Sequence, residues 1–333
     1  MKTITSSFFF LPILLSIIAF GAVGYISGLE ALFIVVVLSI LEVTLSFDNA
    51  VVNAKVLERM SPTWQHRFLT WGILLAVFGT RFILPILIVS AALFMSPLSV
   101  LMIAVTDPEQ YGHLLESIHG AITSFGGVFL MMVSLKYFFN KAKEIHWIHV
   151  IEAHLVKWGR IEAIEIALAL TFLTVLTFFT HFNTTTVLIS GIVGLILFIL
   201  MEGLTGALSI ESVDMARAGG VLFLYLEVLD TAFSLDGVVG AFALSNNLLV
   251  IAVGLGVGAF FVRSLTLHLV ERKTLTKLIY LEHGAHWAIL GLSGAMLANL
   301  VIHVPEVFIG LIGLFFVAFA YRSSVREMRS SIT

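Results

Sequence analysis

Apolar residues fill long runs of about twenty positions that recur along nearly the whole chain. A helix needs about 20 apolar residues to cross a hydrocarbon core of roughly 30 Å, and within lipid the backbone must satisfy its own hydrogen bonds. The alternation of polar and apolar residues typical of barrel strands is absent from these runs. The pattern therefore predicts an all-α, polytopic membrane protein with about ten transmembrane helices, at residues 8–28, 31–54, 68–94, 118–139, 161–180, 184–204, 219–244, 248–269, 282–302 and 305–321.

The connections between these predicted helices alternate in charge. Every second connection, and the C-terminal end, carries basic residues, among them Lys55, Lys141, Arg217, Arg272 and Arg322. Lys and Arg are absent from the others, which are the turn around Ser27 and residues 95–117, 181–183, 245–247 and 303. Because cytoplasmic loops are enriched in Lys and Arg, we expect a multi-pass protein of the inner (cytoplasmic) membrane with both termini in the cytoplasm.

The first apolar run, residues 8–28 after Lys2, has the outline of a signal peptide. It is longer than a usual signal-peptide core, and the charge alternation holds only if this run stays in the protein. We therefore interpret it as an uncleaved first span.

The amino-acid composition limits the kinds of chemistry that the protein could perform. With 59% hydrophobic residues, 12% charged residues and a mean hydropathy of +1.07, the chain is not a soluble domain. It has no cysteine, which excludes disulfides, thiolate catalysis and thiolate metal sites. The chain has no stripe of basic residues that would indicate nucleic-acid binding. Any bound metal would have to be coordinated by oxygen atoms or by imidazole nitrogens.

Two of the predicted helices contain ionisable residues in a shared pattern. In the second, Glu42 is followed six residues later by Asp48, then by Asn49 and Asn53. In the seventh, Asp230 and Asp236 have the same spacing; Ser46 of the first motif matches Ser234 of the second. Each charged group within a membrane costs roughly 2.5 to 3.5 kcal/mol on insertion scales, so four acids in two matched segments indicate a working site.

The two motifs also predict an internal symmetry. The second and seventh spans are an odd number of crossings apart, so the motifs would run in opposite directions through the membrane. His119-Gly120-Ala121 is matched by His283-Gly284-Ala285, and Arg81 by Arg263. We therefore expect two inverted-topology repeats, residues 1–160 with a cytoplasmic loop and residues 161–333, a plan common in secondary transporters with a site near the midplane.

Helix geometry leaves the arrangement of the acids open. Six residues turn an unbroken helix by about 600°, which puts Glu42 and Asp48 about 240° apart, so both face one ligand only if the helix unwinds. Breaks near Asn49 and Gly237 would allow this; otherwise Glu42 and Asp230 form a separate polar layer. The oxygen-rich set suits a hard divalent cation such as Mn²⁺, Ca²⁺ or Mg²⁺.

The other interpretation of these acids is structural: they would pair with Arg81 and Arg263 to hold helices together. Arg81 is expected to be a counter-ion, and Arg263, nearer the cytoplasmic end, to extend its charge toward the surface. Glu227 lies on the same helical face as Asp230 and fits either a site role or an arginine partner.

Several residues outside the motifs have simpler interpretations. We expect His119 and His283 to act as hydrogen-bonded helix caps, and Glu282 to pair with His286 at the i and i+4 positions. Residues 141–160 are predicted to form a cytoplasmic loop with an amphipathic surface helix and solvated histidines, His146, His149 and His154. The glycines of the spans, including Gly254 and Gly258, indicate close helix packing.

The segment from Glu42 to Asn53, with Ser46-Phe47-Asp48-Asn49, and the later Ser234-Leu235-Asp236 resemble the TerC family of integral membrane proteins. The resemblance covers most of the chain and is closest to the family's larger bacterial branch. It implies Mn²⁺ efflux, not enzymatic activity, and no prosthetic group. The metal-site residues that it implies are Glu42, Asp48, Asn49, Asp230 and Asp236. Gly237 departs from the family pattern, which often has asparagine there.

Three functions follow as hypotheses. The first is a divalent-cation exporter working by alternating access, for which protons are the simplest counter-ion. The second is an intramembrane aspartyl protease, although the Gly-x-Gly-Asp pattern of those enzymes is replaced by Ser-Phe-Asp and Ser-Leu-Asp. The third is a membrane scaffold in a metal or tellurite stress-response complex.

Overall fold

The computed structural model describes residues 7–210, 215–245 and 247–330, and this part of the chain is helical without any strand. The elements are α1 (Ser7–Leu45), α2 (Phe47–Leu57), α3 (Pro62–Leu74), the π-helix η1 (Leu75–Ile83), α4 (Leu84–Ala92), α5 (Pro97–Thr106), α6 (Pro108–Ser117), α7 (His119–Phe138), α8 (His149–Trp158), α9 (Ile164–Thr177), α10 (Thr184–Ile210), α11 (Met215–Leu244), α12 (Leu248–Glu271), α13 (Thr274–Lys277), α14 (Leu281–Asn299) and α15 (Glu306–Ser330).

Among the described residues, four helical segments are long and apolar enough to cross a membrane: Phe9–Leu45, His119–Phe138, Thr184–Thr205 and Leu248–Glu271. Shorter apolar helices include Pro97–Thr106 and Ile164–Thr177. Large apolar side chains such as Ile17, Tyr25 and Phe94 lie exposed on the surface, where lipid would cover them. The chain is therefore a helical membrane protein.

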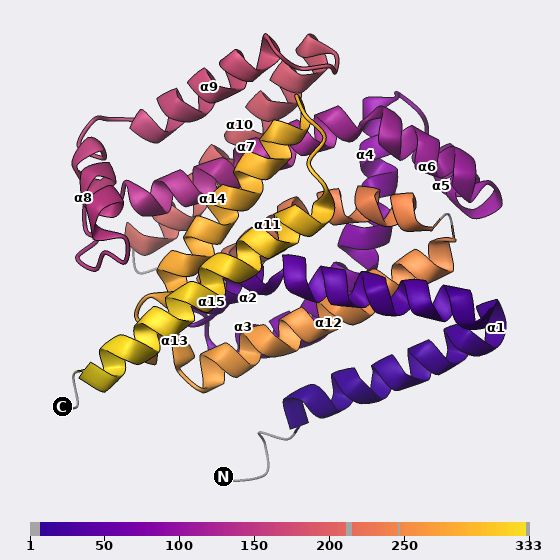
Figure 1. Cartoon of the computed structure of the whole chain (residues 1–333), viewed down its shortest axis with the longest axis horizontal. Coiled ribbons are helices and arrows are strands. Elements are labelled where there is room, and N and C mark those ends of the chain that lie inside the picture. Colours follow the sequence, from indigo (N-terminus) through magenta and orange to yellow (C-terminus); the bar gives the residue numbers. More distant parts are fainter. Residues whose placement is uncertain (1–6, 211–214, 246, 331–333) are drawn as a thin grey trace.

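Helix α1 is two helices joined at Gly28. Gly28 has φ 88° and ψ 178°, a conformation that residues with a side chain rarely adopt. The chain turns back there, and Figure 1 shows the two arms of α1 meeting at the end of the molecule away from both termini. The predicted segments 8–28 and 31–54 correspond to the first arm and to the second arm continued by α2.

Helices α7, α9, α10, α11, α12, α14 and α15 occupy the other predicted ranges with shifted ends. The predicted segment 68–94 is more complex, since its middle forms the π-helix η1 between α3 and α4. The expected loop at 95–117 contains α5 and α6 instead. Ser96 and Asp107 cap them by accepting hydrogen bonds from the backbone N–H of Ser99 (3.1 Å) and Gln110 (3.0 Å).

The main core surrounds α7, which packs against α10, α11 and α14. Small residues allow the close approach: a Cβ at Gly127 would lie 2.7 Å from Leu297 Cγ, and one at Gly194 would lie 2.4 Å from the carbonyl oxygen of Phe125. The Ser293 hydroxyl donates a hydrogen bond to the carbonyl oxygen of Gly127 at 2.8 Å. Helix α1 packs on α12, so elements of the two predicted halves interleave.

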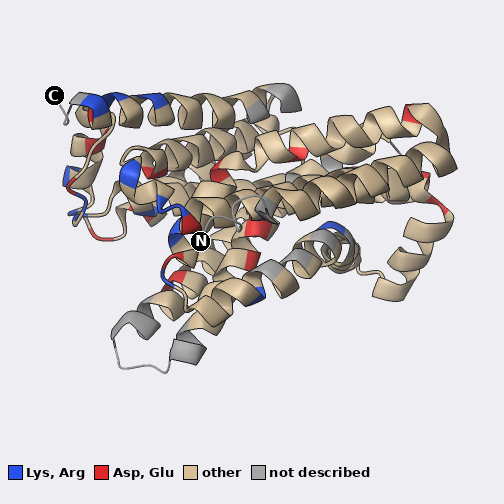
Figure 2. Cartoon of the chain, turned by 90° about the horizontal axis from the view of Figure 1, so that it is seen from below, with Lys and Arg blue, Asp and Glu red and all other residues tan. Residues whose placement is uncertain are grey.

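Charge is distributed unevenly between the ends of the molecule. Figure 2 shows Lys and Arg gathered toward the end that carries the C-terminus, whereas the opposite end shows acids. Two arginines depart from this pattern: Arg81 and Arg263 are buried inside the helix bundle, 6% and 3% exposed. They mark the polar site described next.

Candidate intramembrane polar site

The first acidic motif lies at the junction between α1 and α2. Ser46 separates the helices with φ −102° and ψ 11°, although the hydrogen bond from Ser46 N to the Glu42 carbonyl oxygen (3.0 Å) is kept. We expected a break near Asn49, but the observed break lies three residues earlier, at Ser46.

The expected break at Gly237 is wrong, because α11 runs without interruption from Met215 to Leu244. Gly237 faces Glu42, because a Cβ at position 237 would lie 3.7 Å from Glu42 Oε2, an ordinary van der Waals contact. Helix α11 therefore passes the Glu42 carboxylate without bending.

Glu42 is buried in an ion pair. Its Oε1 accepts a short hydrogen bond from Arg81 Nη2 and another from the Ser46 hydroxyl at 3.1 Å. Gly258 of α12 covers the stem of the side chain, since a Cβ there would lie 2.4 Å from Glu42 Cβ. The carboxylate is thus held between α1, the π-helix η1 and α12.

Asp230 of α11 lies between two arginines. Its Oδ2 is 3.9 Å from Arg81 Nη1 and 3.7 Å from Arg263 Nη2. Its Oδ1 accepts a hydrogen bond from Asn49 Nδ2 at 2.9 Å. Asp230 therefore connects α2 to both arginines.

We expected Arg263 to extend its charge toward the surface, but its side chain is buried inside the helix bundle. Its Nη2 donates to Glu227 Oε1 (2.9 Å) and Oε2 (3.1 Å), and its guanidinium carbon lies 4.1 Å from the centre of the Phe68 ring. Gly72 leaves room for the guanidinium, because a Cβ there would lie 2.3 Å from Arg263 Nη1. Glu227 is thus an arginine partner.

Asp48 has a different environment. It is 1% exposed; its Oδ1 accepts a hydrogen bond from the Asn49 backbone N–H at 3.0 Å, and its Oδ2 has no hydrogen-bond partner among the described residues. The carboxylate faces α15, where a Cβ at Gly313 would lie 3.8 Å from Oδ2. No described Lys, Arg or His forms an ion pair with it.

Two amide oxygens of the same helix also lack partners. Asn49 Oδ1 and Asn53 Oδ1 are buried without a hydrogen bond in the described part of the chain. Because Asn49 Nδ2 must face the acceptor Asp230 Oδ1, the Asn49 oxygen is directed elsewhere. Helix α2 thus presents one carboxylate oxygen and two amide oxygens that are free to accept.

The predicted ligands therefore fall into two sets. The structure brings Glu42, Asn49 and Asp230 together around Arg81, whereas Asp48 points to another side of α2, and the side chain of Asp236 lies outside the described residues. Within the described part of the chain, no three His, Asp or Glu side chains converge as a metal site.

A further buried carboxylate, not expected from the sequence and separate from the acidic motifs, lies in α8. Glu152 is 0% exposed and accepts hydrogen bonds from His283 Nδ1 (2.8 Å), Trp287 Nε1 (2.9 Å) and the backbone N–H of Trp147 (3.1 Å). Lys143 Nζ lies 3.1 Å from it. Burial raises the pKa of Glu152, but the hydrogen bonds from His283 and Trp287 and the charge of Lys143 outweigh it and hold that pKa below its usual range.

This contact changes the interpretation of the cytoplasmic loop. Residues 141–160 are tied to α14 through Glu152, and only the part from His149 to Trp158 is helical. We expected His283 to cap a helix, but its ring binds Glu152 instead. His149 and His154 are exposed as expected, whereas His146 lies 3.9 Å from Glu152 Oε2.

The expected pair of Glu282 and His286 does not form through the carboxylate. His286 Nδ1 meets the Glu282 carbonyl oxygen at 2.8 Å, and its ring stacks on Tyr137 with centres 3.6 Å apart. The Glu282 carboxylate instead pairs with Lys55 Nζ at 3.0 Å. That ion pair links the C-terminal end of α2 to α14, beside the Glu152 contact.

Comparison with known proteins identified one family. The sequence profile of DUF475, described as a protein of unknown function, matches residues 47–331, which begin at the first residue of α2. Neither the curated proteins nor the solved structures contain a match to the chain. Because the matched region spans most of the sequence, the chain belongs to the DUF475 family.

Proposed function

We propose that the protein is a transporter that exports a divalent metal cation, with Mn²⁺ as the foremost candidate, by alternating access. One observation carries the proposal: Asp48 is buried in a membrane protein with a free carboxylate oxygen and no cationic partner among the described residues. An isolated ionised carboxylate is unfavourable in such surroundings. A cation that visits the site would supply the missing charge.

The ligand chemistry supports a hard ion. The free oxygens of Asp48, Asn49 and Asn53 belong to carboxylate and amide groups, which Mn²⁺, Mg²⁺ and Ca²⁺ accept as ligands. Asp236 of α11, the counterpart of Asp48 in the second motif, is proposed to supply a second carboxylate. Similarity of the motifs to the TerC family favours Mn²⁺ within this group of ions.

The buried arginines fit a different role in the same mechanism. Glu42 with Arg81, and Asp230 with Arg263, are the equivalent pairs of the two proposed repeats, and they join α1, η1, α11 and α12. Removing one member of a buried pair leaves an uncompensated charge. We propose that these pairs keep the two halves in register while the helices around Asp48 open to alternate sides.

Export must work against the membrane potential. Moving a charge across the membrane costs roughly 2.3 kcal/mol per 100 mV, so a divalent ion needs about twice that. Proton uptake by the carboxylates that release the metal is the simplest coupling. We propose that about ten spans in two inverted repeats place both termini in the cytoplasm, with export directed away from the basic end.

The test is manganese accumulation in cells that lack other manganese exporters. Cells producing the intact chain should hold less Mn²⁺ than cells producing Asp48→Asn or Asp236→Asn at equal membrane abundance. Glu144→Ala, a change of an exposed glutamate in the 141–160 loop, is the matched control and should behave like the intact chain. If Asp48→Asn lowers cellular manganese as well as the intact protein does, the proposal is wrong. A membrane-protein cleavage lost in both aspartate variants would favour the protease hypothesis.

A further inference from the structure

Helix α8 has its polar and apolar faces reversed for a helix in water. Its acid, Glu152, is fully buried, whereas Val150 is 74% exposed and Trp158 is 53% exposed. A surface helix of a soluble region turns its apolar side chains inward and its charges toward the solvent. The outward face of α8 consists of Val150, Ile151, His154, Lys157 and Trp158, and Arg160 and Ile161 continue it beyond the helix.

The buried side of α8 fixes which residues face outward. Glu152 accepts hydrogen bonds from His283 Nδ1 (2.8 Å) and Trp287 Nε1 (2.9 Å) of α14. Lys143 Nζ lies 3.1 Å from the same carboxylate. Two residues turn a helix by about 200°, so Val150 lies opposite Glu152. Rotating α8 to bury Val150 would withdraw Glu152 from these partners, and the apolar face is therefore held outward.

The charges on the outward face are basic and unpaired. Lys157 and Arg160 are exposed, and neither forms an ion pair with an acid in the described part of the chain. The exposed acids of this loop, Glu144 and Glu162, lie outside α8. Lys and Arg bury their carbon chains along an apolar surface while their charges reach polar groups. A helix face that combines apolar residues, Trp and basic residues is typical of helices that lie in the headgroup layer of a membrane.

The position of α8 fits such a layer. Figure 1 shows α8 at the left margin of the molecule, and it packs against α7. Residues 159–163 join it to the apolar helix α9, on which Phe172 and Val175 are exposed where lipid would cover them. Trp is enriched at the boundary between membrane and water, which is where Trp158 would lie. The outward face of α8 therefore continues the lipid-facing surface of α9.

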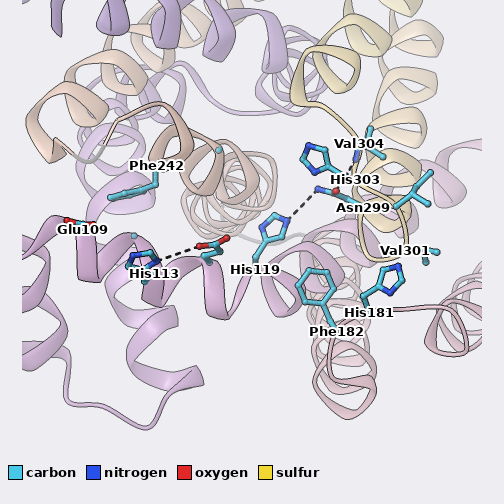
Figure 3. Close-up of a pocket in the computed structure, with 14 residues that line it drawn as sticks. Glu109, His113, His119, His181, Phe182, Phe242, Asn299, Val301, His303 and Val304 are labelled. Atoms are coloured by element: carbon cyan, nitrogen blue, oxygen red, sulfur yellow. Dashed lines mark hydrogen bonds and ion pairs between the residues drawn. The ribbon is translucent and has the colours of Figure 1, made fainter. Parts of the chain in front are cut away.

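The opposite end of the molecule lacks these basic groups. A cavity of about 580 Å³ opens there between α6, α7 and the α14–α15 connection, and two exposed glutamates, Glu109 and Glu116, line it together with histidines (Figure 3). The connections that form it contain no Lys or Arg; they are residues 95–117, 181–183 and 299–305. An anionic partner would meet carboxylates at that end and basic side chains at α8.

We propose that the outward face of α8 binds anionic phospholipid headgroups of the leaflet at the basic end of the molecule. Lys157 and Arg160 meet the phosphate groups, while Val150, Ile151 and Trp158 lie in the apolar boundary beneath them. Each Lys or Arg near an anionic leaflet strengthens binding by roughly fivefold, so the two together contribute roughly 25-fold. This surface is independent of the transported ion, and its test needs no transport activity.

The experiment measures lipid contact at α8 in the full-length protein, reconstituted into nanodiscs with equal amounts of phosphatidylglycerol and phosphatidylcholine. Because the chain has no cysteine, Val150→Cys provides a single position for a fluorophore. Either phosphatidylglycerol or phosphatidylcholine carries bromine on its acyl chains, and bromine quenches the fluorophore on contact. The ratio of the two quenching values measures which lipid occupies the face.

The test variant adds Lys157→Gln and Arg160→Gln to the labelled chain. The matched control instead adds Arg272→Gln and Lys277→Gln, which remove two exposed charges at the basic end but outside α8. All four changes lie at exposed side chains, so both variants should fold like the intact chain.

We expect the labelled chain and the control to prefer phosphatidylglycerol by roughly fivefold or more, the share of one basic residue, and the test variant to lose the preference. A fluorophore on Val105→Cys of α5, an exposed apolar position at the opposite end, should show no preference for phosphatidylglycerol. Absence of quenching at Val150→Cys by either lipid would place the face in water or against a protein and overturn the proposal. Equal quenching by the two lipids, or a preference that survives in the test variant, would overturn the assignment to anionic headgroups.

Discussion

Two neighbouring residues, Asp48 and Asn49, show how the site divides at the scale of single side chains. Asn49 is tied to Asp230 and through it to the arginines, whereas the Asp48 carboxylate faces the small Gly313 of α15. The sequence predicted that both would belong to one polar site. It did not predict that the Asp48 carboxylate would lack a salt bridge to the described residues, because that depends on which helix faces each side of α2.

Asp48 has no ion-pair partner among the described residues, whereas Glu42 and Asp230 share Arg81. We therefore expect substitutions at Asp48 and at Arg81 to have opposite effects on the stability of the fold. Asp48→Asn removes an uncompensated buried charge while keeping the side-chain shape, so the thermal midpoint in detergent should stay equal or rise. Arg81→Ala leaves Glu42 and Asp230 without their shared partner and should destabilise the fold by about 3 kcal/mol or more. Fluorescence-detected thermal unfolding of both variants checks this. A clear loss of stability in Asp48→Asn would mean that this carboxylate is a structural element.

Glu152 predicts a pH-dependent contribution to stability. Because its pKa is held below the ordinary value of 4.5, the ion pair stabilises the fold fully above that value and is lost as pH falls through the lower pKa of the folded state. Lys143, His146 and His283 face this carboxylate. Glu152→Gln should therefore lower the thermal midpoint at pH 7, and the gap to the intact chain should shrink only well below pH 4.5. A gap that closes already at pH 5.5 would contradict this assignment.

At the scale of helices, apolar runs predicted the elements better than polar signals predicted their breaks. Ten runs have helical counterparts, but α5 and α6 were missed even though Ser96-Pro97 and Asp107-Pro108 carry the cap-then-proline signal of a helix start. The break at Ser46 and the continuity of α11 at Gly237 depend on packing between α1, α11 and α12. Such contacts between distant segments leave no local pattern in one sequence.

Packing of α1 on α12 predicts a sensitive position at Gly258. The Ser39 hydroxyl donates to the Gly254 carbonyl oxygen at 3.0 Å, and a Cβ at Gly258 would lie 2.4 Å from Glu42 Cβ. Gly258→Val should force the helices apart, lower stability by about 1–3 kcal/mol and weaken the hold of Arg81 on Glu42. Gly294→Ala in α14 is the control, since a Cβ there meets nothing within 4 Å and alanine favours helix. Equal melting of the two variants would show that α1 and α12 are not tightly packed.

At the scale of the whole molecule, the charge pattern and the two acidic motifs supplied the main expectations. Lys and Arg do gather toward one end of the structure. The Glu152 contact could not be foreseen, because a glutamate within a charged loop is ordinarily solvated. Glu152 becomes buried and hydrogen-bonded only because α8 packs against α14 and excludes water.

The proposed orientation makes a prediction that the cysteine-free chain is well suited to test. Single cysteines at Leu29, Ser117 and Glu144 would each lie at an exposed position, the first two away from the basic end and the third within the 141–160 loop. A membrane-impermeant thiol reagent should label Leu29→Cys and Ser117→Cys in right-side-out vesicles, and Glu144→Cys only in inside-out vesicles. Leu29 is the decisive position, because it labels together with Ser117 only if both arms of α1 cross the membrane and the chain turns at Gly28 on the far side. Labelling of Leu29→Cys together with Glu144→Cys would place both positions on the same side of the membrane, although three predicted spans (31–54, 68–94 and 118–139) separate them. That result would contradict the proposed topology of the first half.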